Sequence, residues 1–181
     1  MNTARRVLIL FAHPALQKSR VNHQLAAAVR GMDGVTFHDL YEEYPDLHID
    51  ADREQRLLRE HDAVVLQHPF YWYSSPAILK EWEDIVLERG FAYGEDGTAL
   101  RGKLWLTAIT TGGPRESYHV SGAHRYTIRE LLAPFEQTAR LCGMEFLEPF
   151  VTHAAHELSR VEIIARAEEY RREIEKLRDA R

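Results

Sequence analysis

Residues 7–22 read VLILFAHPALQKSRVN, and this stretch decides the fold class. It opens with a continuous apolar run over residues 7–12, which is typical of a strand buried on both faces. From Val21 the apolar residues recur at helical spacing, and a polar loop separates the two parts. A strand, a loop and a helix in this order form the repeating unit of a parallel sheet.

The same alternation continues along the chain. Further strands are predicted over residues 35–40, 63–66, 104–109 and 146–151. Further helices are predicted over residues 52–60, 78–86, 128–141 and 161–177. Ser74, Ser75 and Pro76 favour a helix start, and Gly90 is placed to end that helix. Pro134 predicts either a kink or a fresh helix start.

These elements predict a single α/β domain over residues 1–181, with helices on both faces of a parallel sheet. In such a sheet, ligands bind beyond the carboxyl ends of the strands, where the strand order reverses. We therefore expect a site in the loops that follow the first, third and fourth strands.

The composition narrows the class of protein. Hydrophobic residues make up 45 % and charged residues 28 %, as in ordinary folded domains. A net charge of −5 provides no basic field, so no nucleic-acid partner is expected. The lone Cys142 excludes an internal disulfide and indicates a reducing compartment. The longest apolar run is too short to span a bilayer and no signal-peptide cleavage site follows it, so we expect a cytoplasmic protein.

The loop after the first strand has the composition of a phosphate site without glycines. Ser19 is placed to cap the following helix, whose first-turn N–H groups face any bound anion. Asn22 lies in that first turn, and His13 or Arg20 is available to supply positive charge. On this loop alone, a plain helix cap at Ser19 and an ordinary strand-end histidine at His13 are the favoured interpretation.

The loop after the third strand contains Pro69, Phe70, Tyr71, Trp72 and Tyr73. Four consecutive aromatic side chains at the mouth of a sheet expose a large apolar area, which usually marks a binding surface. Their flat rings suit a planar ligand. One or two of these side chains are expected to fill the core instead.

The loop after the fourth strand begins with Thr110, Thr111, Gly112 and Gly113. Glycines let backbone N–H groups approach a ligand without obstruction by a Cβ atom. Tyr118, His119 and His124 follow and are placed to reach the same mouth, although His119 is more simply an ordinary surface residue.

Together the three loops offer an anion anchor, an aromatic wall and a set of backbone amides. A phosphate at one end and a planar heterocycle at the other describe FMN. No GxGxxG motif occurs, so we expect no separate dinucleotide domain. The pairs His153 with His156 and His119 with His124 lack a cysteine or carboxylate at ligand spacing, so no metal is expected.

These loops resemble those of the flavodoxin-like NAD(P)H:quinone oxidoreductases. The matching motifs are HPxxxxSxxN from residue 13, HPFYWYSSPAILKEWED from residue 68 and TTGG from residue 110, and the resemblance covers residues 7–151. The nearest subgroup is the ancillary proteins of bacterial glutathione-gated potassium-efflux systems, which share stretches like DLYEEYPDLHID from residue 39 and GFAYGEDGTALRGK from residue 90.

The resemblance implies a three-layer sandwich with a five-stranded parallel sheet in the order 2-1-3-4-5. It also implies hydride transfer from NAD(P)H to a quinone through a bound flavin, with FMN favoured over the FAD of larger relatives because this chain is short. The flavin phosphate and ribityl chain would contact His13, Ser19, Arg20, Val21 and Asn22. The flavin ring would contact Pro69, Phe70, Tyr71, Trp72, Tyr73, Thr110, Thr111, Gly112 and Gly113. Tyr118 and His124 stand where relatives carry a catalytic tyrosine and histidine that stabilise developing charge.

The resemblance further implies a homodimer with the flavin near the subunit boundary. An alternative function is a regulatory subunit of a glutathione-gated potassium-efflux transporter, with secondary reductase activity and a peripheral location at the inner membrane. A one-electron carrier like flavodoxin is disfavoured by the mild charge of −5 and by the aromatic, donor-rich pocket.

Overall fold

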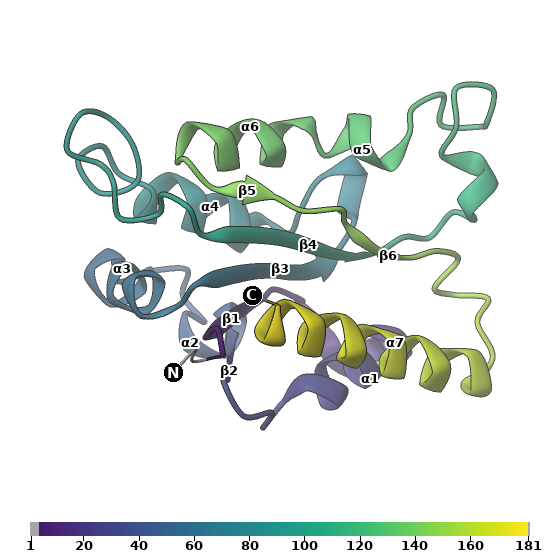
Figure 1. The fold of residues 1–181 in the computed structure, drawn as a ribbon. Helices are drawn as coiled ribbons and strands as arrows, with labels where there is room; N and C mark the ends of the chain where they lie inside the picture. The colour runs from purple at the N-terminus through teal and green to yellow at the C-terminus, as the bar shows by residue number, and fades with distance from the viewer. Residues whose placement is uncertain (1–3, 181) are drawn as a thin grey trace.

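A computed structural model describes residues 4–180 and shows a parallel sheet between two layers of helices (Figure 1). Its strands are β1 (Val7–Phe11), β2 (Val35–Asp39), β3 (Ala63–Pro69), β4 (Leu104–Thr110), β5 (Glu145–Phe146) and β6 (Phe150–Thr152). They run in the order β2-β1-β3-β4-β5, with β6 also paired to β4. Every pairing is parallel, which confirms the flavodoxin-like order.

The last part of the sheet differs from the single fifth strand expected over residues 146–151. Two short strands replace it, because β5 pairs with the start of β4 and β6 pairs with its end. Pro149 lies between them and has no N–H group to donate to a neighbouring strand. The described sheet therefore has six strands instead of five, and β6 brings the loop after it to the edge where β4 ends.

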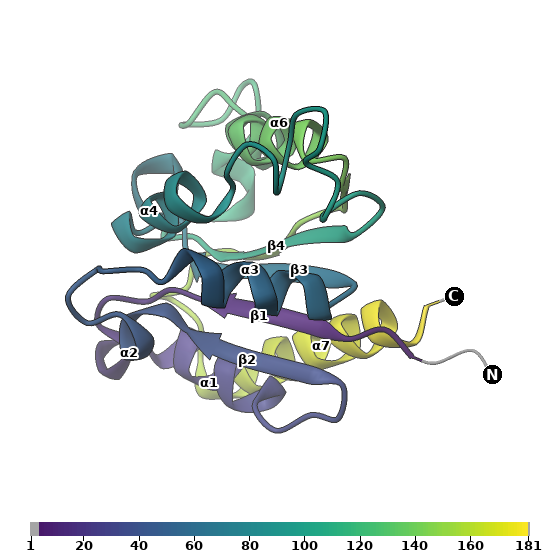
Figure 2. The same cartoon turned by 90° about the vertical axis from the view of Figure 1, so that its left-hand side faces the viewer.

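Two helices cover one face of the sheet. α1 (Arg20–Val29) and α7 (Arg160–Asp179) pack against each other there (Figure 2). Val7, Ile9 and Val65 point toward them and form a buried cluster with side chains of both helices. Because successive side chains of a strand point to opposite faces, the remaining strand residues are left for the other face.

The opposite face is covered by α3 (Ala51–Glu60), α4 (Ala77–Val86) and α6 (Ala133–Leu141). Leu8, Leu10 and Leu66 point into this second cluster, and Trp82 of α4 is its largest fully buried side chain outside the sheet. Both faces are therefore closed by helices, as predicted, and the strand ends remain as the place where the sheet meets solvent.

The helix boundaries agree with some of the local sequence signals and differ from others. Pro134 lies in the first turn of α6, after α5 (Ile128–Leu131) has ended, so a fresh helix start is the correct alternative of the two. α4 ends at Val86, well before Gly90. The short helix α2 (Leu40–Glu43) was not predicted; it begins where the Asp39 carboxylate accepts hydrogen bonds from two backbone N–H groups.

α7 is the longest helix, with 20 residues. It buries Ile163, Tyr170 and Ile174 against the sheet and turns a charged face outward. Within residues 4–180 no helix is both long and apolar enough to span a membrane.

Candidate functional site

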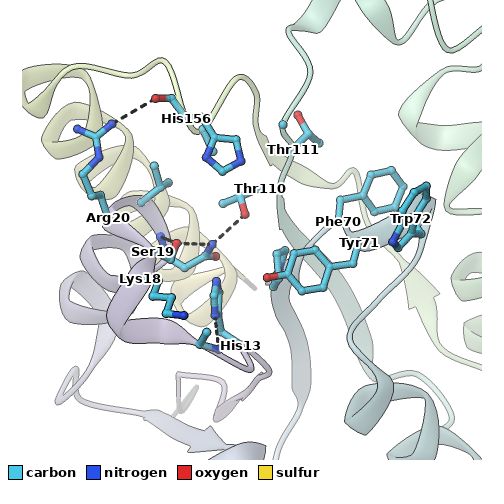
Figure 3. Close-up of a pocket in the computed structure, with 16 residues that line it drawn as sticks. His13, Lys18, Ser19, Arg20, Phe70, Tyr71, Trp72, Thr110, Thr111 and His156 are labelled. Carbon is cyan, nitrogen blue, oxygen red and sulfur yellow. Dashed lines mark hydrogen bonds between the residues drawn. The ribbon is translucent and has the colours of Figure 1, made fainter.

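A cavity of about 780 Å³ opens at the carboxyl edge of the sheet (Figure 3). Among the predicted residues it is lined by His13, Ser19, Arg20, Val21, Asn22, Pro69, Phe70, Tyr71, Trp72, Thr110, Thr111 and Gly112. The loops after β1, β3 and β4 therefore do meet in one cavity. Tyr73, Gly113, Tyr118 and His124 do not line it; they form a cluster beside it.

Residues of the first turn of α1 form one end of the cavity. The Ser19 hydroxyl accepts hydrogen bonds from the Asn22 backbone N–H at 3.2 Å and from the Asn22 side-chain amide at 3.1 Å. The same amide donates to Thr110 Oγ1 at 2.9 Å, so it ties α1 to the end of β4. Asn22 Oδ1 is buried and has no partner within the described residues, which leaves an acceptor for a ligand hydroxyl or N–H group.

Two cationic side chains lie at this end of the cavity. Arg20 donates to the carbonyl oxygens of Leu158 at 3.1 Å and His156 at 3.4 Å, which holds its guanidinium at the rim (Figure 3). Lys18 was not predicted and also lines the cavity. Together with the positive end of the helix dipole, they favour an anion such as a phosphate.

His13 is a poor source of positive charge. Burial lowers its pKa, although a backbone hydrogen bond opposes that shift. Its Nδ1 accepts a hydrogen bond from the Ala15 N–H at 3.1 Å, which in the neutral ring places the proton on Nε2. The positive charge expected from His13 or Arg20 therefore comes from Arg20, with Lys18.

The aromatic loop divides between core and surface. Phe70 is 9 % exposed and belongs to the core, as expected for one of the four, whereas Trp72 is 92 % exposed. Trp72 and Tyr73 both have positive φ angles, of 49° and 62°. Side chains with a Cβ atom rarely adopt this conformation, which here turns successive rings in different directions. Tyr71 lies at the cavity with its ring 6.3 Å from that of His13, whereas Tyr73 turns away from it.

The loop after β4 presents free backbone donors. The N–H groups of Gly112 and Gly113 donate to no group within residues 4–180, whereas the Thr111 N–H donates to Thr152 at 2.9 Å. A Cβ atom on Gly113 would lie 2.9 Å from His124 Nε2, so this position has no room for a side chain unless His124 moves. Glycine here permits a ring to lie directly on the backbone.

A ring cluster extends from this loop. The rings of Tyr118 and His124 are 4.5 Å apart, and the Tyr73 hydroxyl lies 3.2 Å from His124 Nδ1. Tyr118 also contacts His153, whose Nδ1 is 3.2 Å from Thr111 Oγ1. The cluster thus joins the loops after β3, β4 and β6, and it is connected to the cavity through Thr111.

Sequence reasoning missed the contribution of the loop after β6. Ala155 and His156 line the cavity, and His153 joins the ring cluster. The histidine-rich segment HAAH at residues 153–156 is the sequence signal for this loop, because two side chains able to donate hydrogen bonds follow a predicted strand. Within the described part of the chain, no three His, Cys, Asp or Glu side chains are placed to hold a metal ion.

Comparison with known proteins agrees with this architecture. A family model described as a flavodoxin-like fold matches residues 5–177. The chain belongs to this family. A curated relative, the glutathione-regulated potassium-efflux system ancillary protein KefG of Pectobacterium carotovorum subsp. carotovorum (strain PC1), is 49 % identical over 158 residues, covering 87 % of this chain and 86 % of the relative.

Solved structures show the same fold over nearly the whole chain. One described as general stress protein 14 in complex with FMN, from Treponema denticola, has a TM-score of 0.91 and 39 % identity, covering 95 % of this chain and 99 % of that one. An NADPH-quinone reductase from P. pentosaceus has a TM-score of 0.85 and 32 % identity, with 93 % and 96 % covered. One described as a thermophilic tryptophan halogenase from Streptomycin violaceusniger has a TM-score of 0.90 and 44 % identity, with 92 % and 97 % covered. The predicted resemblance to flavodoxin-like quinone reductases is therefore confirmed.

Proposed function

We propose that this protein is an FMN-dependent NAD(P)H:quinone oxidoreductase. The observation that carries the proposal is the cavity that joins the first turn of α1, an aromatic loop and the free N–H groups after β4. One end of the cavity is cationic and the other is lined by aromatic rings and backbone N–H groups. A flavin mononucleotide matches both ends, because it carries a phosphate at one end and a flat ring at the other. The FMN-bound and quinone-reductase neighbours support this assignment.

The residues present fit the cofactor. The phosphate would lie at the first turn of α1 with Ser19, Arg20 and Lys18, where helix N–H groups and two cations converge. The unpartnered Asn22 Oδ1 would accept from a ribityl hydroxyl. FAD, the alternative, would need room for an adenosine beyond the phosphate. We favour FMN because the Arg20 side chain is hydrogen-bonded to the loop after β6 at that end, where it would obstruct an adenosine.

The chain would supply position and electrostatics, and the flavin, when bound, supplies the ability to accept a hydride from NAD(P)H and deliver it to a quinone. The Gly112 and Gly113 N–H groups would donate to the polar edge of the ring. Tyr118 and His124 would donate hydrogen bonds to the substrate side, where negative charge develops on a quinone oxygen. Gly113 lets His124 sit close to this edge, because a larger residue would displace it.

The test begins with the visible spectrum of the purified protein. A yellow protein with flavin absorption bands, bleached by NADPH and restored by menadione, is the expected result. Reconstitution with FMN and with FAD, followed by gel filtration, identifies the retained flavin. A protein that retains neither flavin and oxidises neither NADPH nor NADH after reconstitution contradicts the proposal.

A second candidate function is that of an ancillary subunit of a potassium-efflux transporter, located on the cytoplasmic side of the inner membrane. The observation that favours it is the 49 % identity to the ancillary protein KefG of a glutathione-regulated potassium-efflux system. Co-purification of the tagged protein with such a transporter from detergent-solubilised membranes would support this function. Recovery of the transporter only at the level seen with an unrelated tagged flavoprotein would count against it.

We also propose that the protein forms a homodimer. The exposed rings of Trp72 and Tyr126 lie on loops beyond the strand ends, where a second subunit would cover apolar area. Light scattering after gel filtration should give twice the chain mass, and a mass of one chain at micromolar concentration would refute the dimer.

A further inference from the structure

A second pocket, of about 290 Å³, lies beside the ring cluster and is lined by three arginines. We call it the arginine pocket, defined by Arg115, Arg129, Arg166, His153 and Glu148. Its arginines come from three separate segments: the turn after β4, α5 and α7. Positive charges that line one pocket repel one another unless an anion or a carboxylate offsets them.

Carboxylates pair with two of these three arginines, and Glu148 is the one carboxylate that lines the pocket itself. Arg129 pairs with Glu136 at 3.0 Å and with Glu148 at 3.3 Å. Arg166 pairs with Glu169 and donates to the Val151 carbonyl at 2.6 Å. These contacts hold two of the guanidinium groups in place and use part of their donor capacity.

Arg115 is different from the other two arginines. Its side chain is exposed at the mouth of the pocket that it lines, and its guanidinium has no hydrogen bond or ion pair with any residue of the described range 4–180. Five N–H donors in a planar fork are therefore available to a ligand. Arg115 follows directly after the Gly112–Gly113–Pro114 segment, so it is attached to the loop that bears the proposed ring-binding amides.

The pocket adjoins the proposed reaction site through a single side chain. His153 lines the pocket, its ring lies 5.5 Å from that of Tyr118, and its Nδ1 is 3.2 Å from Thr111 Oγ1. Burial is the main cause that lowers the pKa of His153; the charges of Arg115 and Arg166 lower it further, and the charge of Glu116 raises it. The charges of two of the pocket's arginines therefore act on the side chain that the pocket shares with the ring cluster.

We propose that the arginine pocket binds the phosphate monoester that distinguishes NADPH from NADH. The inference rests on the proposed function, since it assigns the coenzyme of that same site. A phosphate monoester is a compact dianion that matches forked guanidinium donors. In this arrangement the nicotinamide would lie at the ring cluster, and the adenosine ribose, which carries the 2′-phosphate of NADPH, would lie at the neighbouring pocket. The dinucleotide without this phosphate leaves the Arg115 guanidinium unpaired and gains nothing there.

Binding tests this assignment without turnover. We would titrate the purified protein, by calorimetry, with adenosine 2′,5′-bisphosphate, adenosine 5′-monophosphate and inorganic phosphate. The expected result is an affinity for the bisphosphate at least about tenfold above that for the monophosphate, and an Arg115→Gln variant that loses about tenfold for the bisphosphate only. Arg172→Gln is the matched control, because Arg172 is an exposed arginine of α7 outside the pocket.

Two binding results overturn the assignment. One is equal affinity for the two nucleotides, and the other is a bisphosphate affinity that Arg115→Gln leaves unchanged. Inorganic phosphate that binds as tightly as the bisphosphate would also overturn it, since the pocket would then be a general anion site.

Kinetics separate this inference from the proposed function. Arg115→Gln should lower kcat/KM for NADPH about tenfold and leave kcat/KM for NADH within about twofold. A wild-type protein that oxidises both coenzymes with equal efficiency would refute the coenzyme assignment but leave the reductase intact. A protein that oxidises neither would refute the reductase, and the calorimetric comparison would still decide what the pocket binds.

Discussion

The loops that follow β1 and β4 leave the same edge of the sheet but are held in different ways. The first is fixed by buried polar contacts, in which the Asn22 side chain joins Ser19 to Thr110. The second is held by partly exposed rings, with His124 between Tyr118 and Tyr73. Both loops come from parallel strands of one sheet, so the difference arises from side chains and not from backbone topology.

Under the proposed function, the first loop would hold the cofactor and the second would exchange substrates. Buried hydrogen bonds fix donor and acceptor positions, because an unpaired buried group costs about 1–3 kcal/mol. Rings in contact at a half-exposed surface can shift at low cost. A cofactor that stays bound suits the loop after β1, whereas substrates that enter and leave in turn suit the loop after β4.

The largest effect should come from breaking the fixed loop. Asn22→Ala removes the amide that links α1 to β4 and the free Oδ1 acceptor, so we expect FMN affinity to fall about 100-fold, equivalent to about 2–3 kcal/mol. Quenching of flavin fluorescence on titration measures this. His23→Ala, at the next and exposed position, is the control and should bind FMN normally. Equal affinities in the two variants would mean that Asn22 does not hold the flavin.

The pH dependence of the unfolding free energy tests β3, the strand that lies between β1 and β4 in the sheet. His68 of β3 is fully buried, its Nε2 has no partner in the described chain, and burial lowers its pKa to about 4. Because the unfolded histidine has a pKa of about 6.5, the unfolded state takes up a proton first as the pH falls, and stability is lost between about pH 6.5 and 4. Between pH 7 and 5 we expect wild type to lose about 2 kcal/mol more unfolding free energy than His68→Leu. Urea denaturation at both pH values checks this, and parallel losses would show that His68 does not titrate as described.

The ring cluster should affect turnover and not flavin binding. His124→Ala and Tyr118→Phe each remove a donor from the substrate side, so we expect kcat/KM for menadione to fall about tenfold with FMN still bound. His119→Ala, an exposed neighbour on the same loop, is the matched control. Wild-type rates in the first two variants would remove this pair from the mechanism.

A smaller effect should follow from Gly113→Ala. The added Cβ would lie 2.9 Å from His124 Nε2 and displace that ring, so we expect turnover to fall about fivefold. If Gly113 acts through His124, the double variant with His124→Ala should be no slower than His124→Ala alone. Additive losses would instead indicate that Gly113 affects turnover by a separate route.

The smallest effect should come from Tyr73→Phe. This change keeps the ring and removes the hydroxyl that lies 3.2 Å from His124 Nδ1. One net hydrogen bond is worth about 0.5–1.5 kcal/mol, so we expect kcat to fall about threefold. Tyr126→Phe, at an exposed tyrosine on the loop after β4, should change nothing. An unchanged kcat in Tyr73→Phe would mean that ring contact alone positions His124.

The loop after β1 was predictable because its signals are local. A cap at Ser19, a strand that ends before His13 and helical spacing from Val21 depend on neighbours in sequence, and the structure places all three as expected. Pro134 is similar, since a residue that cannot donate from its backbone has few places inside a helix.

The remaining parts of the site depend on contacts between distant segments. His156 reaches the cavity because β6 pairs with the end of β4. The sequence does not indicate that pairing, because Pro149 is equally consistent with one interrupted strand over residues 146–151. Tyr73 is predicted to contact the ring ligand with its neighbours; in the structure Trp72 and Tyr73 have positive φ angles and the Tyr73 ring lies against His124, which the sequence does not indicate. No periodic pattern predicts a left-handed conformation at two aromatic residues.

The backbone at Trp72 and Tyr73 has a consequence for engineering. Each non-glycine residue in this conformation costs on the order of 1 kcal/mol, and Trp72 recovers little by burial, because its indole is 92 % exposed. Stabilising substitutions chosen by backbone compatibility alone would therefore replace Trp72 with glycine first. The stabilised protein would unfold at a higher temperature but would lack the exposed indole that this loop presents to solvent.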